Sequence, residues 1–219
     1  FDCDSTLTAM EGIDWLAQNK GCSDKVEVLT AQAMGGKIKF EEVFARRLAL
    51  IQPTLQDLEL LAERYIANQL KDVASVIEKL QSLGKNVFIV SGGYSLAVKH
   101  LAQNLNIPAE NVFAVDLFFN PNGNYLGFDD KNPLTRSGGK KTVIEKIVTT
   151  GSTIFVGDGF TDLEAKNAVD LFIGFGGVII RPIVQQEADI FIKIKSLMPV
   201  LFLACGNLIS EPKDTLKIC

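Results

Sequence analysis

The chain is poor in cysteine and histidine, the residues that build zinc sites, disulfide frameworks and histidine-based catalytic sites. Its four cysteines, Cys3, Cys22, Cys205 and Cys219, are widely scattered and form no CxxC pair. This distribution favours free thiols in a reducing compartment and argues against a zinc site or a disulfide-rich fold. The single histidine, His100, is more typical of a surface residue than of a catalytic base.

Long apolar runs and an excess of positive charge are also lacking. The apolar stretch 196–205 is too short to span a bilayer and is predicted to be buried core. The net charge of −4 provides no broad basic surface, so neither nucleic acid nor a membrane is expected as a partner. With 219 residues, the chain is long enough for one globular domain that carries an insertion.

The chain begins at Phe1, without an initiator methionine and with almost no strand before Asp2. Because a core strand needs roughly four or more residues, we expect further residues upstream in the natural protein. A cytoplasmic enzyme is expected, and organellar targeting stays open because a targeting segment could lie upstream.

The most informative pattern is the opening octapeptide, FDCDSTLT, in which Asp2 and Asp4 are two positions apart. If Phe1 ends a buried strand, Asp2 lies at its carboxyl end, where open α/β sheets bind ligands. Two carboxyl groups there can divide covalent phosphoryl chemistry, one as the nucleophile and the other as a proton shuttle. The alternative is a solvated turn, in which Asp and Ser are common residues.

Three further motifs follow in order along the chain. The apolar run 87–90 precedes Ser91-Gly92-Gly93, whose backbone N–H groups can approach an anion closely. The run 154–156 precedes the acid-rich segment GDGFTD, 157–162, and Lys140 lies between these motifs at an expected helix start. Each motif alone fits an ordinary loop, turn or solvated surface. The chain contains, in this order, an acid pair, a hydroxyl residue, a lysine and a second acid pair. This ordered set argues against coincidence.

The succession of patterns predicts an α/β fold. Strand-like runs occur at 87–90, 112–115, 153–156 and 171–173. Helical patterns alternate with them at 73–83, 95–105, 141–148 and 162–167. This alternation predicts a Rossmann-like parallel sheet with helices on both faces.

Two features are predicted to interrupt this core. The region 14–71 has helical periodicity without a strand-like run, which indicates a small inserted helical cap domain. The core domain is then formed by 1–13 and 72–219. Within the core, a short β-hairpin is predicted over 116–129, because Asn122-Gly123 suits a primed turn.

The four motifs resemble those of the haloacid dehalogenase (HAD) superfamily of phosphatases, and the resemblance covers essentially the whole chain. It narrows to the phosphoserine phosphatase branch through segments outside the shared motifs. These segments are EGID at 11–14, AMGG at 33–36, RRLALIQP at 46–53, and FIGFGG at 172–177 followed by Ile180-Arg181. The stretches MGG and RLALIQP resemble sequences specific to the branch and to its substrate.

The resemblance implies phosphoryl transfer through an aspartyl-phosphate. Asp2 is the implied nucleophile, and Asp4 is the implied general acid that later takes a proton from water. One Mg²⁺ per site is implied, held by the carboxylates of Asp2 and Asp158 and the backbone carbonyl of Asp4. Asp162 is expected to support the waters of the metal and Lys140 from outside the ligand sphere. It could also stabilise a helix N-terminus, and the two roles are compatible.

Other implied contacts divide between the two ends of a phosphorylated amino acid. Ser91, the N–H of Gly92 and Lys140 are expected to bind the phosphoryl oxygens. Glu11 is expected to pair with the ammonium group, and Arg47 with the carboxylate. The neighbouring Arg46 would point elsewhere on the helix.

The remaining substrate contacts are expected from an apolar lid. Met34, Gly35 and Phe40 would close over the site and exclude water, and Thr161 would add a hydroxyl group.

The resemblance implies Mg²⁺-dependent hydrolysis of O-phospho-L-serine to L-serine and phosphate, the last step of serine biosynthesis, by a monomer or homodimer. An alternative keeps the fold but transfers the phosphoryl group to another alcohol, or acts on another small phosphomonoester. A third hypothesis, a non-catalytic phosphoserine sensor, is disfavoured because none of the motif residues is missing.

Overall fold

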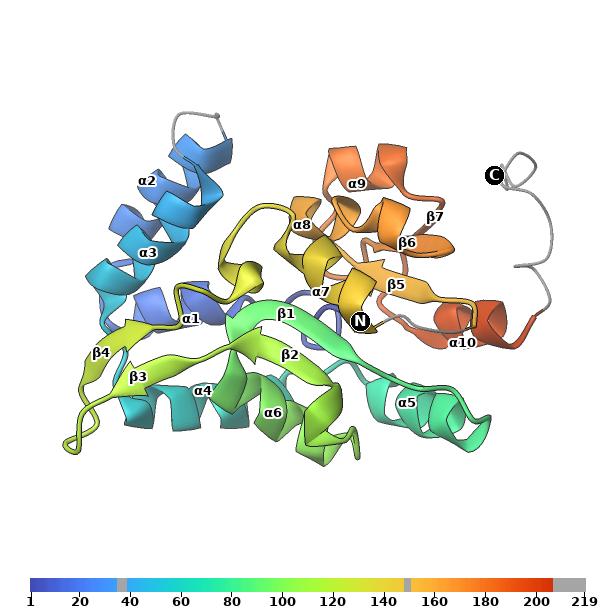
Figure 1. Ribbon diagram of the computed structural model, residues 1–219, viewed down its shortest axis with the longest axis horizontal. Coiled ribbons are helices and arrows are strands. Elements are labelled where there is room, and N and C mark those ends of the chain that lie inside the picture. The colour runs from blue at the N-terminus through green and yellow to red at the C-terminus, as the bar shows by residue number, and fades with distance from the viewer. Residues whose placement is uncertain (35–38, 148–150, 207–219) are drawn as a thin grey trace.

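The computed structural model describes residues 1–34, 39–147 and 151–206 as an α/β arrangement (Figure 1). The helices are α1 (Gly12–Asn19), α2 (Ser23–Met34), α3 (Phe40–Ile51), α4 (Leu55–Ala67), α5 (Val73–Ser82), α6 (Ser95–Asn104), α7 (Gly139–Ile147), α8 (Phe160–Leu163), α9 (Pro182–Glu187) and α10 (Met198–Cys205). The strands are β1 (Ile89–Tyr94), β2 (Val112–Val115), β3 (Leu117–Phe119), β4 (Tyr125–Phe128), β5 (Ile154–Gly157), β6 (Leu171–Phe175) and β7 (Ile190–Ile192). None of the helices in these three ranges is long and apolar enough to cross a membrane.

The parallel strands fall into two groups that the first two residues join. β1 pairs with β2, while β5, β6 and β7 pair in that order. The backbone nitrogen of Phe1 donates to the carbonyl of Phe88, and its carbonyl accepts from the nitrogen of Val90, both at 2.9 Å. On the other side, the nitrogen of Asp2 donates to the carbonyl of Val156 at 2.9 Å. The order is therefore β2-β1-(1–2)-β5-β6-β7, and Asp2 lies at its centre.

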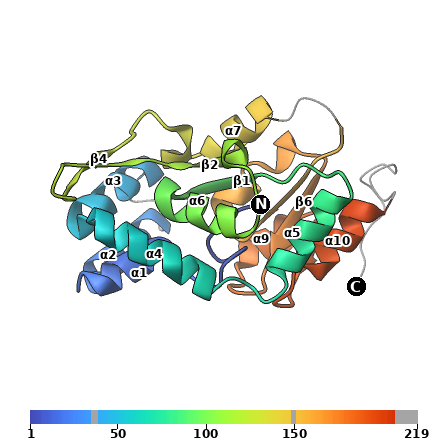
Figure 2. The same ribbon diagram turned by 90° about the horizontal axis from the view of Figure 1, so that it is seen from below.

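Helices cover both faces of this sheet, which confirms the predicted Rossmann-like class. In Figure 2, α5, α6 and α10 lie on one side and α7 lies on the other. α5 buries an apolar stripe from Val73 to Leu80, because these side chains recur at helical spacing on one face. The prediction that 196–205 is buried core is only partly correct. In α10, Val200 is buried against the core, whereas Phe202 is 70% exposed.

In the region predicted to be an inserted cap, the secondary-structure elements that the structure describes are all helices. α2 and α3 lie side by side and project away from the sheet, at the upper left of Figure 1. α4 instead packs along α6. One cluster of buried apolar side chains therefore extends from the inserted helices into the sheet. The domain boundaries at 14 and 71 remain predictions.

β3 and β4 form an antiparallel hairpin in the segment where one is predicted. Gly123 lies in its turn with a φ of +78°, a conformation that glycine adopts without steric cost. The hairpin contacts the inserted helices at two points. The ring centroid of Phe128 lies 5.2 Å from that of Phe44 in α3, and the nitrogen of Leu55 donates to the carbonyl of Gly123 at 2.9 Å.

The boundary of β1 differs from the prediction. The glycines of Ser91-Gly92-Gly93 predict a loop, but β1 continues through them to Tyr94. The pairing of β1 with β2 becomes irregular between Val90 and Tyr94. The strand thus leaves the regular ladder where the glycines begin, so the anion-binding motif lies at the end of the strand.

Two further differences lie in the second half of the chain. The helix predicted over 162–167 begins earlier, at Phe160, and ends at Leu163; a 3₁₀ helix, Lys166–Ala168, follows it. α9 and β7 add a helix and a last parallel strand after β6, and neither is predicted from the sequence.

Candidate active site

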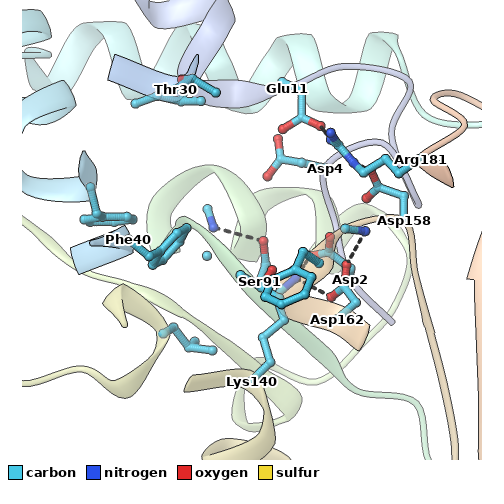
Figure 3. Close-up of a pocket in the computed structure, with 18 of the residues that line it drawn as sticks. Asp2, Asp4, Glu11, Thr30, Phe40, Ser91, Lys140, Asp158, Asp162 and Arg181 are labelled. Atoms are coloured by element: carbon cyan, nitrogen blue, oxygen red, sulfur yellow. Dashed lines mark hydrogen bonds and ion pairs between the residues drawn. The ribbon is translucent and has the colours of Figure 1, made fainter. Parts of the chain in front are cut away.

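An open cavity of about 1360 Å³ lies between the carboxyl ends of the central strands and the inserted helices (Figure 3). Eleven of the residues predicted for the site line it: Asp2, Asp4, Glu11, Phe40, Arg47, Ser91, Gly92, Lys140, Asp158, Thr161 and Asp162. Gly35 lies outside the described residues, and so does the side chain of Met34. The fold therefore gathers side chains from all four motifs around one space.

Lys140, in the first turn of α7, is the buried cation at the floor of the cavity. Its Nζ lies 2.8 Å from Oδ1 of Asp2 and 2.5 Å from Oδ1 of Asp162. Burial alone would lower the pKa of Lys140, but the charges of Asp162 and Asp2 outweigh burial and raise it. Lys140 therefore stays charged and holds both carboxylates in place.

Three buried carboxylates beside Lys140 could hold a metal ion. One oxygen each of Asp2, Asp158 and Asp162 lie within 4.8 Å of one another. Burial, followed by the charge of Asp2, raises the pKa of Asp158 and of Asp162 to about 7. A divalent cation would relieve this repulsion, because hard cations bind carboxylate oxygens.

Asp162 has a second set of contacts that fix its position. Its Oδ2 accepts a hydrogen bond of 2.9 Å from the nitrogen of Gly159, at the start of α8. Gly157 allows this close approach, because a Cβ there would lie 2.3 Å from Cγ of Asp162. The residue thus belongs to the acidic cluster and also stabilises the first turn of a helix. Its role in metal binding stays a prediction.

Asp4 is held by two donors, neither of which is predicted from the sequence. Its Oδ1 accepts from the nitrogen of Gly12 at 2.6 Å and from the hydroxyl of Tyr65 at 2.7 Å. Burial and the charge of Asp2 raise the pKa of Asp4 to about 7, although both hydrogen bonds oppose this shift. In the sequence, Tyr65 matches only the apolar period of a helix, and no local signal identifies its polar contact.

Glu11 and Arg181 form a second charged group at the mouth of the cavity. Oε1 of Glu11 accepts from the hydroxyl of Ser5 at 2.7 Å and from Nη2 of Arg181 at 3.3 Å. Nε of Arg181 donates to Oδ2 of Asp158 at 3.0 Å, so Arg181 bridges two acids, as Figure 3 shows. Burial, followed by the charge of Asp4, raises the pKa of Glu11 to about 7.

Arg181 is therefore a site residue that the sequence analysis did not identify. The only signal for it is its place in the segment Ile180-Arg181, which contributes to the family resemblance. Its distance in sequence from Glu11, 170 positions, hides the contact from any local pattern.

The side of the cavity formed by α3 carries Phe40 and Arg47. The Nε atom of Arg47 is buried and has no hydrogen-bond partner among the described residues. Across the cavity, the hydroxyl of Ser91 accepts from the nitrogen of Gly93 at 3.0 Å. The cavity thus has a donor-bearing arginine at one end and the acidic cluster with Lys140 at the other.

Comparisons with known proteins agree with this site. The family model of haloacid dehalogenase-like hydrolases matches residues 1–170. The phosphoserine phosphatase of Bos taurus is 42% identical over 195 residues, which cover 88% of this chain and 87% of that protein.

Two solved structures are also similar. A substrate-bound phosphoserine phosphatase complex has a TM-score of 0.77 and 28% identity, covering 93% of this chain and 95% of that one. A phospho-aspartyl intermediate analogue of phosphoserine phosphatase has a TM-score of 0.75 and 28% identity, covering 93% and 96%. The chain therefore belongs to the haloacid dehalogenase-like hydrolases and, among them, to the phosphoserine phosphatase family.

Proposed function

We propose that this chain hydrolyses O-phospho-L-serine to L-serine and phosphate through an aspartyl-phosphate on Asp2. The observation that carries the proposal is the pairing of two unlike carboxyl groups at the centre of the sheet. Asp2 is ion-paired with Lys140, whereas Asp4 lies beside it, half-buried, with its pKa raised to about 7. Lys140 thus offsets negative charge on Asp2, and Asp4 can hold a proton at neutral pH.

The chemistry follows from these two environments. A carboxylate oxygen of Asp2 attacks phosphorus while Asp4 gives its proton to the departing seryl oxygen. Water then attacks the aspartyl-phosphate, and Asp4 takes a proton from that water. Ser91, the N–H of Gly92 and Lys140 bind the phosphoryl oxygens and offset their charge.

The metal in this proposal is Mg²⁺. The close set of buried acidic side chains fits a hard divalent cation, and Asp2 and Asp158 would hold it together with the backbone carbonyl of Asp4. When bound, the ion offsets negative charge on the phosphate and on the acids around it.

Recognition of the amino-acid part is proposed for Arg47, on the α3 side of the cavity, and for Glu11, at its mouth. Arg47 can donate two parallel hydrogen bonds to a carboxylate, and Glu11 can pair with an ammonium group. In this structure Glu11 already pairs with Arg181, so the substrate's ammonium would be a second cation on the same carboxylate. The family name of the relatives supports serine phosphate as the substrate, while the serine-biosynthesis role and the oligomeric state stay predictions.

The test is phosphate release from O-phospho-L-serine with and without Mg²⁺, against phosphothreonine, phosphoethanolamine and a sugar phosphate. We expect selective, Mg²⁺-dependent hydrolysis of phosphoserine and none by the Asp2→Asn variant. Hydrolysis of the other phosphates without phosphoserine would contradict the substrate assignment. Lower phosphate release in the presence of an added alcohol, with a new phosphate ester formed, would instead indicate a phosphotransferase.

A further inference from the structure

We propose that Tyr65 is a positioning residue for the proton transfer, because its hydroxyl group fixes which oxygen of Asp4 carries the proton. This inference rests on the proposed function, since it assigns a role within that reaction. Tyr65 comes from α4 and is the one residue of that helix that lines the cavity.

The hydroxyl of Tyr65 forms a hydrogen bond with Asp4. The side chain is 0% exposed, and its hydroxyl donates to Oδ1 of Asp4 at 2.7 Å. The nitrogen of Gly12 donates to the same oxygen at 2.6 Å. Gly12 leaves room for the phenol, because a Cβ at this position would lie 2.2 Å from the hydroxyl oxygen of Tyr65. The glycine and the tyrosine together enclose one side of the carboxyl group.

Two donors on Oδ1 determine where the proton of Asp4 lies. The N–H of Gly12 can only donate, so Oδ1 must accept from it. Tyr65 has Asp4 as its hydrogen-bond partner, and its hydroxyl completes the acceptor capacity of this oxygen. A proton on the carboxyl group is therefore placed on Oδ2.

Oδ2 faces the anion-binding motif. A Cβ built on Gly93 would lie 2.9 Å from Oδ2 of Asp4 and 3.1 Å from the hydroxyl oxygen of Ser91. The oxygen that carries the proton thus lies on the same side as the residue proposed to bind the phosphoryl group. A carboxyl group rotated the other way would aim its proton at α4, away from the reacting atoms.

The proton and the electron pairs move in two half-reactions. As Asp2 bonds to phosphorus, the bond from phosphorus to the seryl oxygen breaks and its electron pair stays on that oxygen. The proton of Asp4 Oδ2 moves to this oxygen and leaves Asp4 as a carboxylate. In the second half, the oxygen of water bonds to phosphorus, and the electron pair of the bond between the Asp2 oxygen and phosphorus returns to Asp2. One proton of this water moves to Oδ2 of Asp4, and the other stays on the released phosphate.

The test compares Tyr65→Phe with Tyr125→Phe. Tyr125 lies in β4 outside the cavity, so its variant removes the same hydroxyl group without a change at the site. We expect Tyr65→Phe to lower kcat for phosphoserine by about tenfold to a hundredfold, the effect of losing a hydrogen bond to an ionisable group. KM should change by less than about threefold, because the hydroxyl of Tyr65 bonds to Asp4 and is assigned no contact with the substrate. Tyr125→Phe should match the wild type.

The leaving group gives a second readout that loss of stability would not produce. A nitrophenolate departs without needing a proton, whereas the seryl oxygen needs one. The first-turnover release of nitrophenol from p-nitrophenyl phosphate should therefore fall less in Tyr65→Phe than the first-turnover release of serine. If p-nitrophenyl phosphate is not a substrate, the kinetics on phosphoserine alone test the inference: kcat should fall while KM changes little. Unchanged kcat for phosphoserine, or equal losses on both esters together with a lower melting temperature, would overturn the inference.

Two outcomes separate this inference from the proposed function. If the wild type does not hydrolyse phosphoserine, the proposed function itself is wrong. If the wild type is active and Tyr65→Phe is equally active, only the role of Tyr65 is wrong. Should Tyr65→Phe fail to fold, a fluorotyrosine at position 65 keeps the ring and changes the donor strength of the hydroxyl. A kcat that then changes by at least about twofold supports the inference, and an unchanged kcat overturns it.

Discussion

Two adjacent arginines in α3 have different surroundings. Arg46 is exposed, and its guanidinium lies 2.5 Å from the carboxylate of Glu42 one turn earlier. Arg47 lines the cavity, and its Nε is buried. Because neighbouring residues on a helix point in directions about 100° apart, only one of the pair can face the site. The structure places Arg47 in that position.

This difference provides a matched pair of variants. We expect Arg47→Ala to lower kcat/KM for phosphoserine by about tenfold to a hundredfold, because a charged hydrogen bond to the substrate carboxylate is lost. For an aryl phosphate without that carboxylate, the loss should be below about threefold. Steady-state kinetics on both substrates measures the difference. Arg46→Ala, which removes an exposed ion pair, should stay within about twofold of the wild type. Equal losses on both substrates would contradict the assigned role of Arg47.

The residues that could be predicted from the sequence share one property. Asp2, Asp4, Ser91 and Asp158 each lie within a few residues after an apolar, strand-like stretch of the sequence, so their motif and their place at the sheet edge are both encoded locally. The hydroxyl of Tyr65 meets Asp4 only because α4 folds back 61 positions later. Such contacts are set by packing, and no spacing rule in the sequence reports them.

At the scale of elements, the start of α4 shows how one acid joins two helices. Oδ2 of Asp57 accepts from the nitrogen and the hydroxyl of Thr54, at 2.7 and 2.6 Å. The nitrogen of Asp57 donates to the hydroxyl oxygen of Thr54 at 3.2 Å, which completes a capping box. The same side chain accepts from Asn19 at 2.9 Å and lies 2.5 Å from Nζ of Lys20, just after α1. Burial alone would raise the pKa of Asp57, but the hydrogen bonds from Lys20 and Thr54 outweigh it and lower the pKa.

Removal of this cap should destabilise the protein. We expect Asp57→Ala to lower the free energy of unfolding by about 1–2 kcal/mol, since the cap and a charged hydrogen bond are both lost. Because the pKa of Asp57 is lowered in the folded state, its contribution is present above the ordinary aspartate value and is lost as the pH falls through the lowered pKa. Urea unfolding at neutral and acidic pH measures both effects. Asp24→Ala, which removes an exposed first-turn acid of α2, is the control and should change stability less.

Helices and strands could be predicted where the sequence signal lies within the element itself or at its ends. The hairpin of β3 and β4 follows from Asn122-Gly123 between two apolar runs, and α5 from its helical spacing and Gly84. β7 and α9 are short, and neither has a pattern that distinguishes it from a loop. β1 extends past its predicted end because Tyr94 still pairs with Val115 of β2, and packing on α6 and α7 supports a segment that glycines alone would not hold as a strand.

At the scale of the whole molecule, the centre of the sheet concentrates negative charge in a buried place. The carboxyl groups of Asp4, Glu11, Asp158 and Asp162 all have pKa values raised to about 7, with burial as the largest cause. An acid whose pKa is higher in the folded than in the unfolded state binds protons in the folded state that the unfolded state has released. Its contribution to stability is therefore lost as the pH rises from about 4 to about 7.

This sign predicts how metal and pH act together on stability. In a chelator, the melting temperature should be lower at about pH 8 than at about pH 5.5, because the ionised cluster repels itself in the folded state. Asp57 does not mask this effect, because its lowered pKa acts below that window. Mg²⁺ should raise the melting temperature mainly at the higher pH. At a Mg²⁺ concentration of a hundred times its dissociation constant, the free energy of unfolding should increase by about 2.7 kcal/mol.

Calorimetry at both pH values, with chelator or with Mg²⁺, measures these shifts, and Asp158→Asn should lose most of the Mg²⁺ increment. An equal increment in Asp158→Asn would place the ion elsewhere. If the metal-free protein is more stable at the higher pH, the ionised acidic cluster does not destabilise the folded state as its burial implies.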